Sequence, residues 1–261
     1  MLYYTDIAAE LYGSRCKNIP KGVKISKSIC GGIPLTRVEI MRDGLNRERG
    51  TYITLEIPQI ASSLSTRQIS AAAIAQQIYT LLPKQGNVLA IGVGNRAVVA
   101  DSLGPATAER ILATRKLLSA DIPLRSVSVI APGVPATTGI ELPELIQALI
   151  ARLHFAAIIC VDSLCTADIK RLGTNVQISS SGIVPHNGKA LCEKALGVPV
   201  IAVGIPTVMQ KHTDKSGYTA PALTPTSIDA ITQGGAEMLA LAINKALQNN
   251  LSISELHYIT S

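Results

Sequence analysis

Short apolar runs recur along the chain and predict the strands of a sheet. Most of them are rich in Val, Ile, Leu and Ala, and they cover residues 33–40, 51–57, 88–91, 126–130, 155–162 and 199–204. The Ser/Thr-rich segment 173–182 is expected to form a further short strand. Runs of four to eight β-forming residues between turn residues are typical of strands, and continuous apolar runs indicate strands that are buried on both faces. The pattern therefore predicts a sheet with a buried centre.

Apolar residues spaced three and four positions apart predict helices between these runs. The predicted helices cover residues 66–82, 105–118, 143–153, 190–196 and 225–248. Strands that alternate with helices favour an α/β fold with a doubly wound, mostly parallel sheet flanked by helices, as in phosphorylase-like and hydrolase-like proteins. We expect one domain over residues 1–261, with an N-terminal β-hairpin extension at 30–60, and no clear element in residues 1–12.

Composition and charge narrow the classes of partner. The chain is 47% hydrophobic, has one Phe and no Trp, and carries a net charge of +6 from Lys and Arg that are scattered along it. Scattered basic residues without aromatic partners argue against direct nucleic-acid binding. We find no leader, and no apolar run reaches the roughly 18 residues of a membrane helix. The sequence predicts a soluble, cytoplasmic protein with no membrane partner.

Cysteine spacing gives no metal or disulfide motif. The five cysteines, at positions 16, 30, 160, 165 and 192, contain no C-x-x-C pair. Cys160 lies within an apolar run and is expected in the core.

Two carboxylates follow predicted core strands. Asp101 stands after the 88–91 run and a turn at Gly92 and Gly94, and Asp162 ends the 155–162 run. The carboxyl ends of strands in an open α/β sheet usually hold the functional site, so the two side chains could meet there. An Asp that precedes a helix is also a common N-cap, so each residue alone has a simpler structural interpretation.

A close pair of carboxylates can perform acid–base chemistry. Like charges raise the pKa of one partner, which leaves one ionised base and one protonated acid to activate a water and protonate a leaving amine. Nearby loop N–H groups would stabilise the oxyanion, Gly94 and Asn95 are expected as supporting residues, and Glu141 is a third candidate carboxylate. The pair could instead bind a divalent metal if His186 or His212 joined it. The third Gly of a dinucleotide fingerprint, a G-K-[ST] motif and a G-x-S-x-G elbow are all missing from the sequence.

Several long motifs resemble the germination protease family of spore-forming bacteria. They are TDIAAE (5–10), TRVEI (36–40), GTYITLEIP (50–58), VGNRAVVADSLGP (93–105), APGVPATTGIE (131–141), VDSLCTADIKRLGTNVQISSSGIVP (161–185) and LGVPVIAVGIPTVM (196–209). The resemblance implies an endopeptidase without a cofactor that cleaves small acid-soluble spore proteins during germination in the forespore or spore core. It further implies a zymogen, a homotetramer, and an aspartic-type pair at Asp101 and Asp162.

The resemblance also implies a processing site and two alternatives. The segment 5–10 is similar to the activation site of the family, which would make residues 1–6 a propeptide that is cut between Asp6 and Ile7. Gly92–Gly104 and Val161–Ser163 are similar to motifs of hydrogenase-maturation endopeptidases, which implies nickel or zinc at Asp101, Asp162 and His186. A relative that binds peptides without cutting them is the third possibility.

Overall fold

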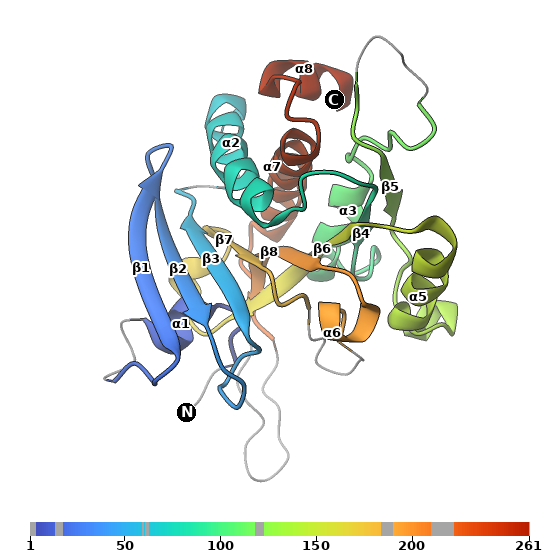
Figure 1. Cartoon of the computed structure of the whole chain (residues 1–261). Coiled ribbons are helices and arrows are strands. Elements are labelled where there is room, and N and C mark those ends of the chain that lie inside the picture. Colours follow the sequence, from blue (N-terminus) through green and yellow to red (C-terminus); the bar gives the residue numbers. More distant parts are fainter. Residues whose placement is uncertain are drawn as a thin grey trace.

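An eight-stranded sheet organises the computed structural model, which describes residues 4–13, 18–58, 60, 63–117, 123–183, 190–209 and 222–260 (Figure 1). In spatial order the strands are β1 (Val23–Cys30), β2 (Ile33–Ile40), β3 (Gly50–Glu56), β7 (Asn175–Ser179), β8 (Val200–Met209), β6 (Ala157–Thr166), β4 (Val88–Gly92) and β5 (Val127–Ile130). Each predicted strand is therefore present, and β1 is an additional one.

The sheet is mixed rather than mostly parallel. Neighbouring strands pair in parallel from β5 through β4 and β6 to β8. From β8 through β7, β3 and β2 to β1, each pair of neighbouring strands is antiparallel. The α/β class expected from the sequence is confirmed, and its parallel part is the half formed by crossover connections. The difference arises because the predicted N-terminal extension continues the main sheet, with Tyr52 of β3 opposite Ser179 of β7.

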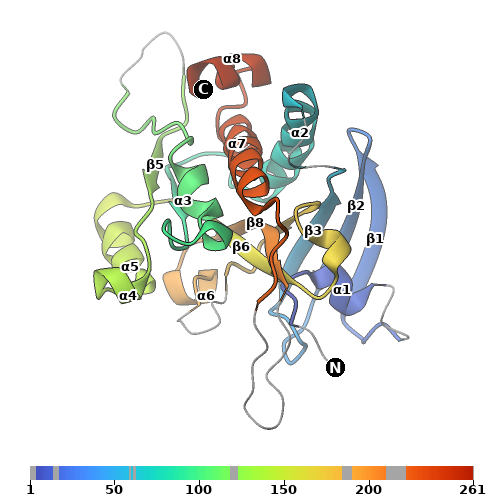
Figure 2. The same ribbon diagram turned by 180° about the vertical axis from the view of Figure 1, so that it is seen from behind.

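Helices cover both faces of the sheet (Figures 1 and 2). On one face, α2 (Leu64–Leu81), α3 (Leu103–Ala108) and α7 (Ile228–Leu247) pack against alternate strand residues such as Ile159, and α8 (Ile253–Thr260) packs on α7. On the other face, α5 (Leu142–Leu153) and α6 (Glu193–Leu196) cover Ile158 and Cys160, while α1 (Ala8–Tyr12) covers β2 and β3. The period of two along each strand separates these two cores.

Several predicted elements differ in extent, and the differences are clearest for one helix and two strands. The helix predicted at 105–118 ends at Ala108. The side-chain amide of Asn244 on α7 donates a hydrogen bond to the carbonyl of Arg110 and accepts one from the N–H of Leu112, and these bonds replace helical ones. The strands expected to end at 162 and 204 continue to Thr166 and Met209, since they pair with each other beyond those points.

Several short elements gave no clear signal in the sequence. They are α1, α8, α4 (Pro135–Thr138) and the edge strand β1. β1 is mostly exposed and carries polar residues at half of its positions, so it lacks the apolar run that marks a buried strand. In the part of the chain that the structure describes, no helix is long and apolar enough to span a membrane.

Candidate active site

Asp101 is held by the loop that follows β4. It closes a 3₁₀ turn, Val99–Asp101, and its Oδ2 accepts a hydrogen bond from the N–H of Asn95 at 2.7 Å. Gly94 has a φ of +123°, and a Cβ there would lie 2.1 Å from the carbonyl oxygen of Asp101, so only glycine fits. Asn95 therefore uses its N–H to hold the carboxylate in place.

Asp101 does not act as the helix cap that its position before α3 allows. The N-cap of α3 is Ser102, whose side chain makes no capping bond within the described residues, and the carboxylate of Asp101 points to the loop instead. Partial burial raises the pKa of Asp101, while the hydrogen bond from Asn95 opposes the rise. The simple interpretation as an N-cap does not fit this geometry.

Asp162 lies inside β6 at the point where the neighbouring strand β4 ends. The pairing of β4 with β6 stops at Gly92 and Val161, so Asp162 is the first residue beyond it, and it lies opposite Gly204 of β8. Its Oδ1 accepts the N–H of Ser163 at 2.7 Å. The strand continues past the carboxylate to Thr166.

The environment of Asp162 favours the protonated form. Burial raises its pKa to about 7, the N–H of Ser163 opposes the rise, and the charges of Asp101 and Asp6 add to it. The structure therefore brings Asp101 and Asp162 close enough to interact electrostatically. One of the two carboxyls is near its midpoint of titration at neutral pH, which suits a proton donor.

A cavity of about 410 Å³ opens beside Asp162. Its floor is formed by the face of β6, β7 and β8 that carries Asp162, Gln177 and Ala202, and its wall includes Arg47 and Tyr52. Ala202 and Gly204 have little or no side chain, which leaves room above the strands. Asp101 is not among the residues that line this cavity.

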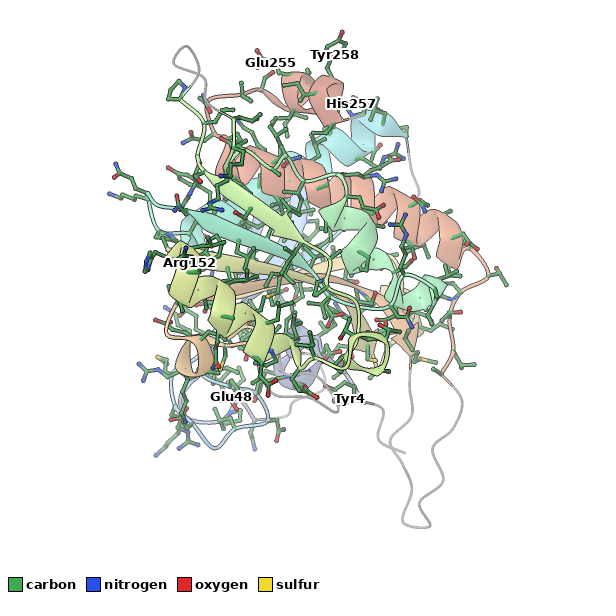
Figure 3. The ribbon with its side chains drawn as sticks, turned by 90° about the vertical axis from the view of Figure 1, so that its right-hand side faces the viewer. Tyr4, Glu48, Arg152, Glu255, His257 and Tyr258 are labelled. Carbon is green, nitrogen blue, oxygen red and sulfur yellow. The ribbon has the colours of Figure 1, made fainter. Side chains whose placement is uncertain are left out.

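The segment before α1 forms part of the wall of this cavity, through Tyr4 and Asp6. The backbone N–H of Asp6 donates to the carbonyl of Cys165 at 2.8 Å, and its Oδ2 accepts the N–H of Cys165 at 2.8 Å. Its Oδ1 accepts from Arg47 Nη2 at 3.2 Å and from the hydroxyl of Tyr4 at 2.9 Å. Tyr4 and Glu48 lie at the same end of the molecule, where both line the cavity (Figure 3).

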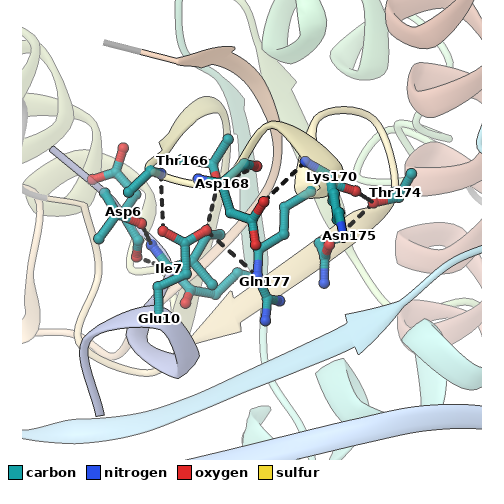
Figure 4. A network of polar contacts seen from close by, with 12 residues as sticks. Asp6, Ile7, Glu10, Thr166, Asp168, Lys170, Thr174, Asn175 and Gln177 are labelled. Atoms are coloured by element: carbon teal, nitrogen blue, oxygen red, sulfur yellow. Dashed lines mark hydrogen bonds and ion pairs between the residues drawn. The ribbon is translucent and has the colours of Figure 1, made fainter. Parts of the chain in front are cut away.

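Two further contacts hold the segment (Figure 4). The side-chain amide of Gln177 donates to the carbonyl of Asp6 at 2.7 Å and accepts the N–H of Ala8 at 2.8 Å, so it spans Ile7, which is fully buried. The carboxylate of Glu10 accepts from the Thr166 hydroxyl and from the N–H of Ala167. Residues 4–12 are thus docked along the ends of β6 and β7.

The other candidates lie elsewhere. Glu141 is the N-cap residue of α5, at the end of an exposed loop, and does not line the cavity. His186 and His212 fall outside the described residues, and within the described ones no group of three His, Cys, Asp or Glu side chains could hold a metal ion. Arg47 and Gln177 were missed by the sequence analysis, since one lies in a charged loop and the other in a short polar strand.

A family model decides the identity of the chain. The model for the germination protease family matches residues 10–219. The chain belongs to this family of peptidases. The germination proteases of Clostridium acetobutylicum and Caldanaerobacter subterraneus subsp. tengcongensis are 33% and 37% identical over 233 and 229 residues. Both alignments cover 80% of this chain, and they cover 71% and 70% of the relatives. The resemblance found in the sequence motifs is confirmed.

One solved structure is also similar. The NiFe hydrogenase maturation protease HycI from Thermococcus kodakarensis KOD1 matches 64% of this chain and 98% of its own at 17% identity, with a TM-score of 0.40. A likeness of this size carries no argument about the site, and the metal alternative stays a prediction.

Proposed function

We propose that this member of the germination protease family is an endopeptidase that cleaves small acid-soluble spore proteins by means of a water activated between Asp101 and Asp162. The observation that carries the proposal is Asp162, a largely buried carboxyl with a pKa of about 7 that lines a cavity whose wall includes Tyr4 and Asp6 of the N-terminal segment. Membership of the family supports the peptidase activity. The substrate class rests on the family resemblance.

The two carboxyls take different roles in this mechanism. Asp101 accepts the N–H of Asn95, a bond that stabilises its ionised form, so Asp101 is the base that takes a proton from water. Asp162 is mostly protected from water and is protonated in a large fraction of molecules at neutral pH, so it donates a proton to the leaving amine. Asp101 then carries the proton that Asp162 must regain before the next cleavage.

The proposal extends to the life cycle of the protein. Synthesis as a zymogen, cleavage between Asp6 and Ile7, assembly into a homotetramer and location in the forespore or spore core are taken from the family resemblance. The presence of Asp6 in the lining of the cavity that Asp162 also lines supports this processing site.

Incubation with a purified small acid-soluble spore protein tests the proposal, with the products measured by mass spectrometry. The wild type should release fragments, and Asp101→Asn and Asp162→Asn should each reduce the rate by more than ten-fold, about 1.4 kcal/mol of barrier, because an amide keeps the shape but does not exchange a proton. Asp43→Asn, at an exposed loop position, is the matched control and should cut normally.

Three results would change the interpretation. Normal cleavage by either active-site variant would contradict the carboxylate pair. Binding of the spore protein without fragments would favour the non-catalytic relative. Loss of activity with a chelator, together with stoichiometric nickel or zinc in the purified protein, would favour the metal-dependent peptidase. We expect activity to survive chelation.

A further inference from the structure

The contacts around the Asp6 carboxylate form a built site for an acidic side chain. Apart from the hydroxyl of Tyr4, they come from other elements: Arg47 from the loop between β2 and β3, and the N–H of Cys165 from β6. A guanidinium and a backbone N–H are the donors that proteins use to bind a carboxylate. This site is in the same cavity as Asp162.

Arg47 is poorly solvated and depends on an anion. Its side chain is 17% exposed, its Nη2 also donates to the carbonyl of Thr5, and the guanidinium lies 5.9 Å from the centre of the Tyr4 ring. Within the described residues its Nε is buried without a hydrogen-bond partner. A buried cation is costly unless it is paired, so the departure of Asp6 would leave a strong preference for another carboxylate.

The backbone contacts at this site do not depend on the sequence of the bound segment. Asp6 pairs through its N–H with the carbonyl of Cys165, and Gln177 binds the carbonyl of Asp6 and the N–H of Ala8. Any extended peptide offers the same groups at the same spacing. The segment is therefore bound as a peptide ligand would be, and Arg47 binds its one charged side chain at this site, Asp6.

We propose that Arg47, the N–H of Cys165 and the amide of Gln177 form a subsite that selects an acidic residue in an extended peptide, and that Asp6 is its intramolecular occupant. Arg47 is the specificity-determining residue and Gln177 fixes the backbone on either side of the next residue. The proposal rests on the proposed function for its statement that substrate peptides use this cavity. Peptide binding can be measured without cleavage, so the two proposals can fail separately.

The test uses two fluorescein-labelled peptides and measures binding by fluorescence anisotropy. One has the sequence of residues 4–10, YTDIAAE, and the other has Asn in place of its Asp. Asp6→Lys in the full chain should expel the segment from the subsite by repulsion from Arg47. This variant should bind the Asp peptide at least about ten-fold more tightly than the Asn peptide, as expected for a charged hydrogen-bond pair.

Variants at Arg47 identify the group that reads the charge. On the Asp6→Lys background, Arg47→Gln should remove the difference between the two peptides, and Arg47→Lys should keep part of it. The wild type and Asp43→Lys, which makes the same charge change at an exposed position, should bind both peptides weakly because Asp6 occupies the subsite. Circular dichroism checks folding, and the mass of each peptide after measurement checks that it was not cut.

Several outcomes would overturn the proposal. They are a folded Asp6→Lys variant that does not distinguish the peptides, a preference that survives Arg47→Gln, and tight binding of the Asp peptide by the wild type. If Asp6→Lys does not fold, Asp6→Asn takes its place, since it removes the charge while keeping the shape, and the same criteria apply.

Discussion

The protonation of Asp162 links the site to the stability of the fold. Burial raises its pKa to about 7, far above the value in an unfolded chain. The protonated form is therefore favoured by folding, and its contribution to stability is complete below the unfolded pKa near 4 and is lost as the pH rises through about 7. At alkaline pH the folded protein carries a buried charge.

Asp162→Asn should remove this pH-dependent cost. Its free energy of unfolding relative to the wild type should rise between pH 5 and pH 8 by roughly 2 kcal/mol, because each unit of pKa shift corresponds to about 1.4 kcal/mol. Urea unfolding at both pH values measures it. For the exposed Asp43→Asn control, we expect the free energy of unfolding to differ from that of the wild type by the same amount at both pH values. A flat profile for Asp162→Asn would show that its carboxyl is ionised in the fold at pH 5.

Gly94 supports Asp101 through its backbone. Gly94→Ala should strain the backbone and push the new Cβ against the carbonyl of Asp101, so the hydrogen bond from Asn95 should break and peptidase activity should fall by more than about ten-fold. Gly139→Ala is the matched control, because Gly139 also has a positive φ but nothing within 4 Å of a Cβ. That variant should lose stability and keep activity when both are assayed below their melting temperatures. Equal activities would contradict the role of Gly94.

At the scale of elements, α1 and the residues before it are the part of the fold that the sequence pattern does not predict. Ile7 and Ala8 are fully buried, and the carboxylate of Glu10 binds β6, although α1 has only five residues. A helix this short has little stability of its own, so its contacts with β2, β3 and β6 determine its structure. The local pattern of apolar and polar residues does not indicate such tertiary contacts.

Processing of this segment gives a direct test of its position. Intact-mass measurement of protein matured at mildly acidic pH should reveal a species that begins at Ile7, since the Asp6 carbonyl is held by Gln177 in the cavity of Asp162. Asp101→Asn should keep the uncut chain, and Asp43→Asn should be processed as the wild type is. Full activity in protein that retains residues 1–6 would contradict processing as the activation step.

The elements that could be predicted are those whose own residues determine them. β4, β6 and β8 are continuous apolar runs because both of their faces are buried, and α2 and α5 show helical spacing. Asp101 and Asp162 are candidates because of their positions after such runs. Arg47 and Gln177 could not be found, because their role depends on a segment about 40 residues away from one and about 170 from the other.

At the scale of the whole molecule, the cavity lies where the two halves of the sheet meet. β6 and β8 belong to the parallel half, β7 joins it antiparallel, and Arg47 comes from the loop that leads into β3. Neither half holds the full set of contacts around Asp6. The mixed topology, which the sequence pattern does not reveal, is therefore what brings Arg47 to the side of Asp162.

The pairing of β3 with β7 also bears on how the protein folds. Tyr52 and Ser179 are neighbours in the sheet but lie more than 120 residues apart in the chain. Contacts of such high contact order form slowly, because a long loop must close before they can stabilise anything. During synthesis, the N-terminal hairpins emerge long before their partner strand and expose an open edge meanwhile. We therefore expect the cavity beside Asp162 to form in a late step of folding, so that a nascent or partly folded chain lacks it.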